Sequence, residues 1–255
     1  MLVVAVKSAL QQSVSNIEIL VCDDGSTDDS RDLVAALNDS RVRWLEGVHA
    51  GYPSIPRNRG IRESRGEWIA FLDSDDVWVE TKLEKQLAYA EKQGVDFVSS
   101  NAIRVDPLSG ESGYLLSELK EKLSFKDLIT ENQVITSSVL VRRKIINHVG
   151  GFPEGPDLRV GEDYALWLRI AYYTPLAVID EPLVKYTDDP ENSVRKYSPS
   201  ARQQRIGALK NFLKCQRANG RLFIVLVTVL LKLVYIEMAN LGSNLMRKLK
   251  KFGVR

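Results

Sequence analysis

The sequence predicts an α/β protein whose helices flank a mostly parallel sheet. Short apolar runs alternate with amphipathic helical patterns through the first hundred residues. Strands separated by helices usually pair in parallel. Two acidic turns also follow predicted strands, which is where ligands of such sheets bind. The chain has 255 residues, of which 44% are apolar and 27% charged, and this suits one α/β domain with a tail.

Each element of the first hundred residues has a local signal. The run IEILVC at 17–22 is short, β-rich and followed by a turn, so it predicts a buried strand. The acidic turn after it predicts a helix start, with Ser26 as the N-cap and Asp29 completing a capping box. A helix over 80–94 ends at Gly94, a typical helix stop. Further strands are expected at 41–47, 68–72 and 96–105, and a further helix at 54–66.

The regular alternation ends after residue 106. Helices are predicted over 124–131, 161–173 and 201–220, and strands over 137–143, 176–180 and 183–187. An apolar run then covers 222–236, and five of the last nine residues are basic while none of them is acidic. The pattern predicts an α/β domain over 1–199 and a C-terminal helical region over 200–255.

The apolar run 222–236 contains Lys232 and falls short of the ~20 residues that span a bilayer. It predicts a buried helix that packs on the domain, a helix that lies on a membrane surface, or a marginal anchor. The basic side chains that follow favour the membrane surface, because Lys and Arg close to anionic lipid contribute about 1 kcal/mol each.

The composition excludes several classes of protein. A net charge of +2 argues against broad nucleic-acid binding. The two cysteines, Cys22 and Cys215, form neither a disulfide framework nor a metal-binding spacing, which favours a reducing, cytoplasmic location. With only two histidines, a zinc site built from His and Cys is not expected. The apolar start MLVVAV lacks the basic region and the cleavage pattern of a signal peptide.

The segment FLDSDD at 71–76 gathers three carboxylates directly after a predicted strand. Asp73 and Asp75 are two residues apart, so both side chains can reach one cation if the chain turns there. Hard divalent cations prefer oxygen ligands, and Mg²⁺ is often held by one or two carboxylates together with substrate phosphates. The spacing therefore predicts the protein half of a metal–diphosphate site, and a solvated acidic turn is the alternative.

Two further acidic pairs each have a structural and a functional interpretation. Asp23 and Asp24 follow the strand at 17–22, and one of them is expected to accept a hydrogen bond from a ligand N–H in addition to forming the turn. Glu162 and Asp163 lie at a predicted helix start, where the helix dipole favours carboxylates. One residue of this second pair can equally act as a general base toward an attacking hydroxyl.

Four segments, in order and in register, resemble family 2 glycosyltransferases across residues 3–195. These segments are VKSALQQSVSNIEILVCDDGSTDDS, PRNRGIRESRGEWIAFLDSDDVW, TSSVLVRRKIINHVGGFPE and GEDYALWLRIA. The resemblance implies a GT-A fold, which has a Rossmann-like sheet, and transfer of a sugar from a nucleotide-sugar with inversion. The helical tail expected after residue 199 lies outside the part of the chain that the resemblance covers.

The resemblance assigns donor-binding roles to residues of the first two segments. Asp24, with Asp23 beside it, would contact the nucleobase. Arg57 and Asn58 match the family's ARN-x-G segment near the donor, although Pro56 replaces the usual Ala.

The resemblance assigns the metal and the base as well. Asp73 and Asp75 correspond to the family's D-x-D pair, which faces the ribose and holds Mn²⁺ or Mg²⁺ on the diphosphate, with Asp75 as the metal ligand. Ser74 lies between them and is expected to contact the nucleotide-sugar. Asp163 corresponds to the catalytic base of the family's ED pair. Direct displacement needs such a base and no enzyme nucleophile, which agrees with the lack of a Ser-His or Cys-His arrangement in the sequence.

The expected function is metal-dependent, inverting transfer of a sugar from a nucleotide-sugar, with UDP as the expected nucleotide. The acceptor would be a glycan or a lipid-linked hydroxyl, the location cytoplasmic at the inner face of the plasma membrane, and peripheral membrane contact is expected. No nucleic acid is expected as a partner. A nucleotidyltransferase is a further alternative, but the sequence lacks a Gly-rich phosphate loop followed by Lys.

One departure from the family concerns the start of the chain. Family members begin with a strand similar to VSVIIPTYN, whereas this chain begins inside the helix that follows, at MLVVAVKSAL. A start site placed too far downstream is the favoured explanation. The alternative is an N-terminally truncated, non-catalytic protein that binds a partner or a membrane.

Overall fold

The computed structural model describes residues 1–155, 158, 160–189, 200–216, 227, 229–232, 234–236 and 238. The strands are β1 Ile19–Cys22, β2 Val42–Leu45, β3 Trp68–Ala70, β4 Val77–Trp78, β5 Phe97–Asp106, β6 Gly110–Tyr114, β7 Lys122–Leu123, β8 Leu140–Arg142 and β9 Leu176–Thr187. The helices are α1 Leu2–Leu10, α2 Ser30–Ala35, α3 Ser54–Glu63, α4 Lys82–Gln93, α5 Phe125–Leu128, α6 Arg143–Val149, α7 Glu162–Ala171 and α8 Ala201–Gln216, with the 3₁₀ turn η1 Thr136–Ser138.

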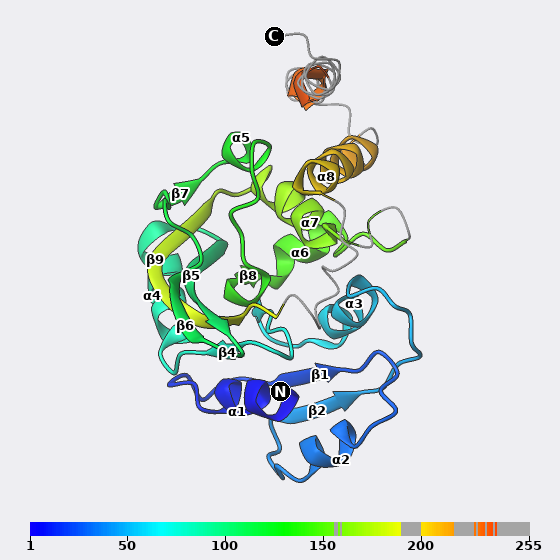
Figure 1. The fold of residues 1–255 in the computed structure, drawn as a ribbon, viewed down its shortest axis with the longest axis vertical. Helices are drawn as coiled ribbons and strands as arrows, with labels where there is room; N and C mark the ends of the chain where they lie inside the picture. Colours follow the sequence, from blue (N-terminus) through cyan, green and yellow to red (C-terminus); the bar gives the residue numbers. More distant parts are fainter. Residues whose placement is uncertain are drawn as a thin grey trace, which may run out of the picture.

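A two-stranded parallel sheet of β1 and β2 lies with α1 and α2 at one end of the molecule (Figure 1). Its core is formed by Val6, Val21 and Val34, one from each of α1, β1 and α2. The prediction of strands at 17–22 and 41–47 is therefore confirmed. Helix α3 packs against β1 and leads to the larger sheet.

The larger sheet is mixed, and the prediction of mostly parallel pairing is wrong in this respect. Its order is β3-β8-β5-β9-β4, with β6 paired to β5 and β7 paired to β9. Only β5 and β9 pair in parallel among these described strands. Strands β3 and β5 do run parallel to each other, because both are antiparallel to β8. The late strand β8 inserts between them, and the local alternation of strands and helices carries no signal of that insertion.

Two local predictions need correction. The helix after β1 begins at Ser30 rather than after Ser26, because the side chain of Asp23 accepts hydrogen bonds from the Gly25 and Ser26 amides and holds a turn there. The two predicted strands at 176–180 and 183–187 form one strand, β9. Its register shifts opposite Asn101 of β5, which accommodates Pro182 as strand irregularities commonly do.

Aromatic side chains from four elements or loops form the centre of the main core. The ring of Phe71 lies 5.2 Å from that of Phe152 and 5.9 Å from that of Trp167, and Phe97 lies 5.6 Å from Trp167. Nearly all of α7 is buried in this cluster. Trp167 is fully buried. This packing fixes the position of the α7 N-terminus, where Glu162 and Asp163 lie.

Helix α8 covers α7 through Leu209 and Phe212, which are both fully buried. Helical residues within 227–238 lie beyond α8, at the opposite end of the molecule from β1 and β2 (Figure 1). Residues 222–226, 228 and 233 of the predicted apolar run lie outside the described residues. None of the helices in the described part of the chain combines the length and the hydropathy needed to cross a bilayer.

Candidate active site

The turn after β3 carries the predicted D-x-D pair and is held by a network of hydrogen bonds. Ser137 of η1 accepts from the Asp73 amide at 3.0 Å and donates to a carboxylate oxygen of Asp76 at 2.5 Å. The other Asp76 oxygen accepts from the Thr187 amide at 2.9 Å, and the Thr187 hydroxyl donates to the Asp75 carbonyl. Residues from β3, η1 and β9 thereby fix the backbone on which Asp73 and Asp75 stand.

Asp76 is the structural member of the acidic turn. It is 1% exposed, whereas Ser74 and Asp75 are exposed to solvent. Burial raises the pKa of Asp76 to about 7, and the carboxylates of Asp73 and Asp75 add to this effect, while hydrogen bonds from Ser137 and Thr187 oppose it. The turn therefore leaves Asp75 exposed and Asp73 partly exposed, and it retains Asp76 as a buried support.

Arg57 connects this turn to the start of α7. Its guanidinium lies 2.6 Å from an Asp73 oxygen and 2.7 Å from a Glu162 oxygen. The guanidinium also lies 5.5 Å from the centre of the Phe152 ring. Burial lowers the pKa of Arg57, but Asp73 and Glu162 outweigh burial and raise it. The family resemblance places Arg57 near the donor, and the structure adds a direct ionic link between the two acidic segments.

The N-terminus of α7 presents two carboxylates with different surroundings. Glu162 is 5% exposed, and burial followed by the Asp163 charge raises its pKa to about 7, with Arg57 offsetting part of the shift. Asp163 is partly exposed and accepts hydrogen bonds from the Thr136 hydroxyl at 3.0 Å and the Tyr164 amide at 2.6 Å. A carboxylate has about four lone-pair sites, so Asp163 can still accept a proton from another group.

Replacing Glu162 with Gln is expected to change how stability depends on pH. The pKa of Glu162 is about 7 in the folded chain against an ordinary 4.5, so the folded chain keeps a proton that the unfolded chain releases. The stability linked to this proton is complete below the ordinary pKa and is lost as the pH rises through the folded one. Glu162→Gln should remove this component, which is on the order of 3 kcal/mol.

Urea unfolding of the wild type and Glu162→Gln across about pH 5 to 8 measures this difference. The exposed Glu80→Gln variant is the matched control and should keep the wild-type slope. An identical slope for all three proteins would show that Glu162 titrates as an ordinary carboxyl.

The acidic turn after β1 is held by hydrogen bonds within the turn and to the loop after β2. The carboxylate of Asp24 accepts from the Ala50 amide at 2.9 Å and the Gly51 amide at 3.1 Å. Burial raises the pKa of Asp23, but hydrogen bonds from Ser26 and Gly25 outweigh burial and lower it overall. Both carboxylates thus order loops, and Asp24 remains the more accessible of the two, with 29% of its side chain exposed.

Helix α3 links the two acidic turns. Its Arg59 donates to the backbone carbonyls of Asp23 at 2.7 Å and Leu45 at 2.8 Å, at the ends of β1 and β2. One helical turn thus carries Arg59 toward the β1 turn and Arg57 toward the β3 turn. Helix α3 therefore contacts both acidic turns.

Asn58 has a structural role that its sequence motif does not reveal. Its side chain donates to the Phe152 carbonyl at 2.9 Å and to Glu154 at 2.7 Å, and it accepts from the Phe152 amide at 2.8 Å. A Cβ at Gly151 would lie 2.6 Å from the Asn58 oxygen, so the close approach requires glycine there. In this arrangement Asn58 holds the loop before α7, and the prediction that it binds the donor stays a prediction.

The predicted residues thus fall into two groups. Arg57, Asp73 and Asp163 converge through α3, the β3 turn and α7. Asp23 and Asp24 occupy the β1 turn, which α3 contacts through Arg59. Sequence reasoning missed the contributions of Asp76, Thr136, Ser137 and Thr187. Three of these residues lie inside the segments that carry the family resemblance, but only the fold shows what they contact.

The fit of a divalent cation depends on how many protein ligands are available. In the part of the chain that the structure describes, no three His, Cys, Asp or Glu side chains are grouped to hold a metal ion. Asp73 and Asp75 supply two carboxylates from one turn, the first partly exposed and the second exposed. Mg²⁺ commonly takes one or two carboxylates from protein when phosphate oxygens complete its shell. The single positive charge of Arg57 also faces Asp73, Glu162 and Asp163 together. This excess negative charge fits a cation that arrives with a diphosphate.

Several known proteins are similar to this chain in sequence. The glucosyltransferase WfaP of Escherichia coli, described as transferring from UDP-Glc to α-D-GlcNAc-diphosphoundecaprenol, is 33% identical over 168 residues, which cover 65% of this chain and 62% of WfaP. The succinoglycan biosynthesis protein ExoO of Rhizobium meliloti is 34% identical over 174 residues, or 64% of this chain and 49% of ExoO. The chain thus spans less than two thirds of the length of these relatives.

Similar solved structures show the fold of this chain, and a family model shows the family to which it belongs. Residues 1–349 of S. aureus TarS in complex with UDP-GlcNAc match with a TM-score of 0.70 and 19% identity, covering 92% of this chain and 68% of that chain. The likeness shows the predicted α/β GT-A fold, with a central sheet flanked by helices. Residues 1–150, more than half of the chain, match the model of the family described as Glycosyl transferase family 2. The protein therefore belongs to glycosyltransferase family 2.

Proposed function

We propose that this protein transfers a sugar from a UDP-linked donor to an acceptor hydroxyl with inversion at the anomeric carbon. The observation that supports this best is the convergence of three groups. The carboxylates of Asp73 and Asp75 suit a diphosphate with its cation. Arg57 links the turn that carries them to Glu162 at the start of α7. The partly exposed Asp163 is the next residue of α7. In this arrangement the donor diphosphate would face the Asp73–Asp75 turn, and the acceptor hydroxyl would face Asp163.

The proposed reaction uses Asp163 as the general base. Its carboxylate takes the proton of the acceptor hydroxyl as the hydroxyl oxygen forms a bond to the anomeric carbon. The bond from that carbon to the diphosphate breaks, and the nucleoside diphosphate leaves with the electron pair. The hydrogen bond from Thr136 keeps the Asp163 carboxylate in a fixed orientation. No covalent enzyme intermediate is required, because a single displacement inverts the configuration.

The donor site would be formed by both acidic turns. Asp24 and Asp23 on the β1 turn serve the nucleobase, and Arg57, Asn58, Asp73 and Ser74 serve the ribose and diphosphate. Asp75, together with Asp73, would hold Mn²⁺ or Mg²⁺, and such an ion stabilises the negative charge of a leaving diphosphate. The removal of the acceptor proton and the positioning of the base are carried out by the side chains of Asp163 and Thr136.

The relatives support the choice of substrates. WfaP is described as using UDP-Glc and a diphosphoundecaprenol-linked sugar, and TarS was solved with UDP and with UDP-GlcNAc. For this chain we therefore propose a UDP-sugar as donor and a lipid-linked glycan as acceptor. The corresponding site of action is the inner face of the plasma membrane.

Calorimetric titration of UDP into the 255-residue protein, with and without Mn²⁺, tests the donor site. We expect binding that depends on the metal and that Asp75→Asn weakens by at least about tenfold, because one of two carboxylate ligands is lost. The matched control is Asp32→Asn, an exposed carboxylate on α2. Metal dependence that survives Asp75→Asn unchanged would move the cation elsewhere.

The same titration bears on the non-catalytic alternative. A folded protein that binds UDP and releases it from a UDP-sugar in the presence of an acceptor supports the transferase. A folded protein that binds no nucleotide at all would favour the alternative of a binding protein that retains only the fold.

A further inference from the structure

The helical residues within 227–238 have two apolar faces. Val229 and Ile236 are buried in the main core, and their spacing of seven places them on the same side of a helix. A second set of apolar side chains is exposed by between 38% and 66%; we call it the apolar stripe, and it consists of Val227, Leu230, Leu231, Val234, Tyr235 and Met238.

The apolar stripe follows a helical face. Its members are separated from the first by three, four, seven, eight and eleven residues, which is the pattern of one continuous side of a helix. That side lies opposite the one that carries Val229 and Ile236. The stripe also holds six of the thirteen exposed large hydrophobic side chains in the described part of the chain, so apolar surface is concentrated there rather than scattered.

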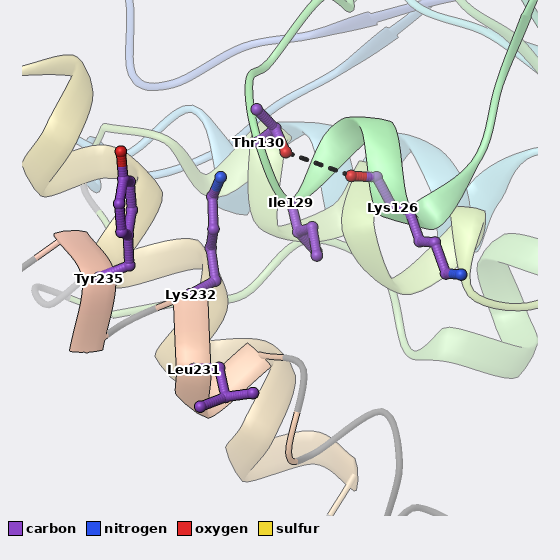
Figure 2. A pocket seen from close by; sticks show the side chains of 6 residues that line it. All are labelled: Lys126, Ile129, Thr130, Leu231, Lys232 and Tyr235. Carbon is purple, nitrogen blue, oxygen red and sulfur yellow. Dashed lines mark hydrogen bonds between the residues drawn. The ribbon is translucent and has the colours of Figure 1, made fainter.

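Basic side chains border the stripe. A pocket of about 430 Å³ lies where the stripe meets the end of α5, and it is lined by Lys126, Ile129, Thr130, Leu231, Lys232 and Tyr235. Figure 2 shows Ile129 extending from the end of α5 toward the helical residues that carry Leu231, Lys232 and Tyr235. The Lys232 ammonium lies 5.6 Å from the centre of the Tyr235 ring. The two lysines, Lys126 and Lys232, thus lie next to apolar side chains of the stripe at this pocket.

The charge of the chain is divided unevenly along the sequence. Residues 200–255 contain twelve Lys or Arg side chains and one acidic side chain, Glu237. Residues 1–199 contain 23 basic and 32 acidic side chains, so the small net charge of +2 conceals a basic C-terminal region and an acidic domain. A partner of the C-terminal region is therefore expected to be anionic as well as apolar.

We infer that the apolar stripe and the lysines beside it form a surface that docks on an anionic lipid bilayer. An amphipathic helix lies in the bilayer interface when its apolar face enters the acyl boundary and its basic flanks contact anionic headgroups. A second copy of this chain is a poorer occupant, because a symmetric contact would bring two strongly basic regions together. The surface is inferred from these side chains alone, whereas its use in presenting a lipid-linked acceptor rests on the proposed function.

Co-sedimentation of the full chain with vesicles tests the inference. We expect the protein to bind vesicles made of equal parts phosphatidylglycerol and phosphatidylcholine and to remain unbound with pure phosphatidylcholine. The combined substitutions Leu230→Ser, Val234→Ser and Met238→Ser should weaken binding by at least about tenfold, because three apolar side chains no longer leave water. Lys126→Gln combined with Lys232→Gln should weaken it further at low salt.

Val48→Ser combined with Leu108→Ser is the matched control, because these side chains are 89% and 97% exposed but lie outside the stripe. This control should bind vesicles as the wild type does. Equal vesicle binding by the stripe variant and the control, or wild-type protein that stays in solution, would overturn the inference. So would a wild-type dimer in the absence of lipid that the stripe substitutions convert to monomer, because a second copy would then cover the stripe.

Circular dichroism and UDP titration of the same variants separate the possible causes of failure. The substituted side chains are exposed, so the fold and any UDP binding should be retained. If the triple variant does not fold, the single variant Leu231→Ser, at a position that is 63% exposed, takes its place. A wild-type protein that binds vesicles but no UDP would count against the proposed function and support the docking surface. A wild-type protein that binds UDP but no vesicles would count against the docking surface and leave the proposed function standing.

Discussion

Asp163→Asn is expected to lower the rate of sugar transfer by about 10²–10⁴-fold while leaving UDP binding close to that of the wild type. The amide has the size and shape of the carboxylate: its oxygen can still accept from the Tyr164 amide, and its NH₂ group can donate to the Thr136 hydroxyl instead of accepting from it. It cannot take a proton from the acceptor hydroxyl. Measurement of transfer from UDP-sugars to a lipid-linked acceptor, together with UDP calorimetry, separates the two properties.

The control for this prediction is Glu84→Gln, which neutralises an acidic residue in the first turn of another helix, α4. This variant should keep both transfer and UDP binding. If Asp163→Asn lost UDP binding and thermal stability together with transfer, Asp163 would be a structural cap of α7 and the base would have to be sought elsewhere.

Arg57→Met is expected to have the largest effect on stability, a loss of about 3–5 kcal/mol at neutral pH. The substitution leaves the carboxylates of Asp73 and Glu162 facing each other across a largely buried site without their shared cation. UDP binding should weaken as well, because the Asp73 turn loses its link to α7. Chemical unfolding and UDP calorimetry on the same preparation measure the two effects.

Two comparisons make the Arg57 prediction specific. Arg62→Met removes an exposed arginine of the same helix, whose pair with Glu154 at 3.9 Å is expected to contribute only about 0–1 kcal/mol. The loss caused by Arg57→Met should also become smaller at acidic pH, since protonation of Glu162 removes one of the stranded charges. A loss as small as that of Arg62→Met would show that the buried ion pairs contribute little.

Several features of the fold could be predicted from short segments. The capping box of Ser124 and Asp127 forms as the sequence over 124–131 indicates, and Gly94 ends α4 in the left-handed conformation. The short apolar runs at 17–22 and 68–72 likewise predicted that the acidic turns follow strands. Such features depend on residues a few positions apart, so the local sequence contains the information that determines them.

Other features of the fold could not be predicted from short segments. The sheet is mixed because β8 inserts between β3 and β5, and the turn that Asp23 holds at Gly25 and Ser26 precedes a helix that begins only at Ser30. Asn58 holds the loop at Phe152, which is 94 residues away. The position of β8 and the contacts of Asn58 depend on residues far apart in the sequence, which only tertiary packing brings together. The Asp23 turn is local, and there the carboxylate of Asp23 competes with Ser26 for control of the backbone.

By itself, the sequence determined the α/β class, the family resemblance, the acidic turns at the ends of strands and the basic character of the C-terminal region. Only the tertiary structure decided how these parts act together. Arg57 and Glu162 are separated by 105 positions, and their ion pair exists because the aromatic core around Trp167 holds α7 against α3. The same is true of the apolar stripe, since sequence periodicity cannot tell which of two apolar helical faces enters the core. Burial of Val229 and Ile236 leaves the other face exposed.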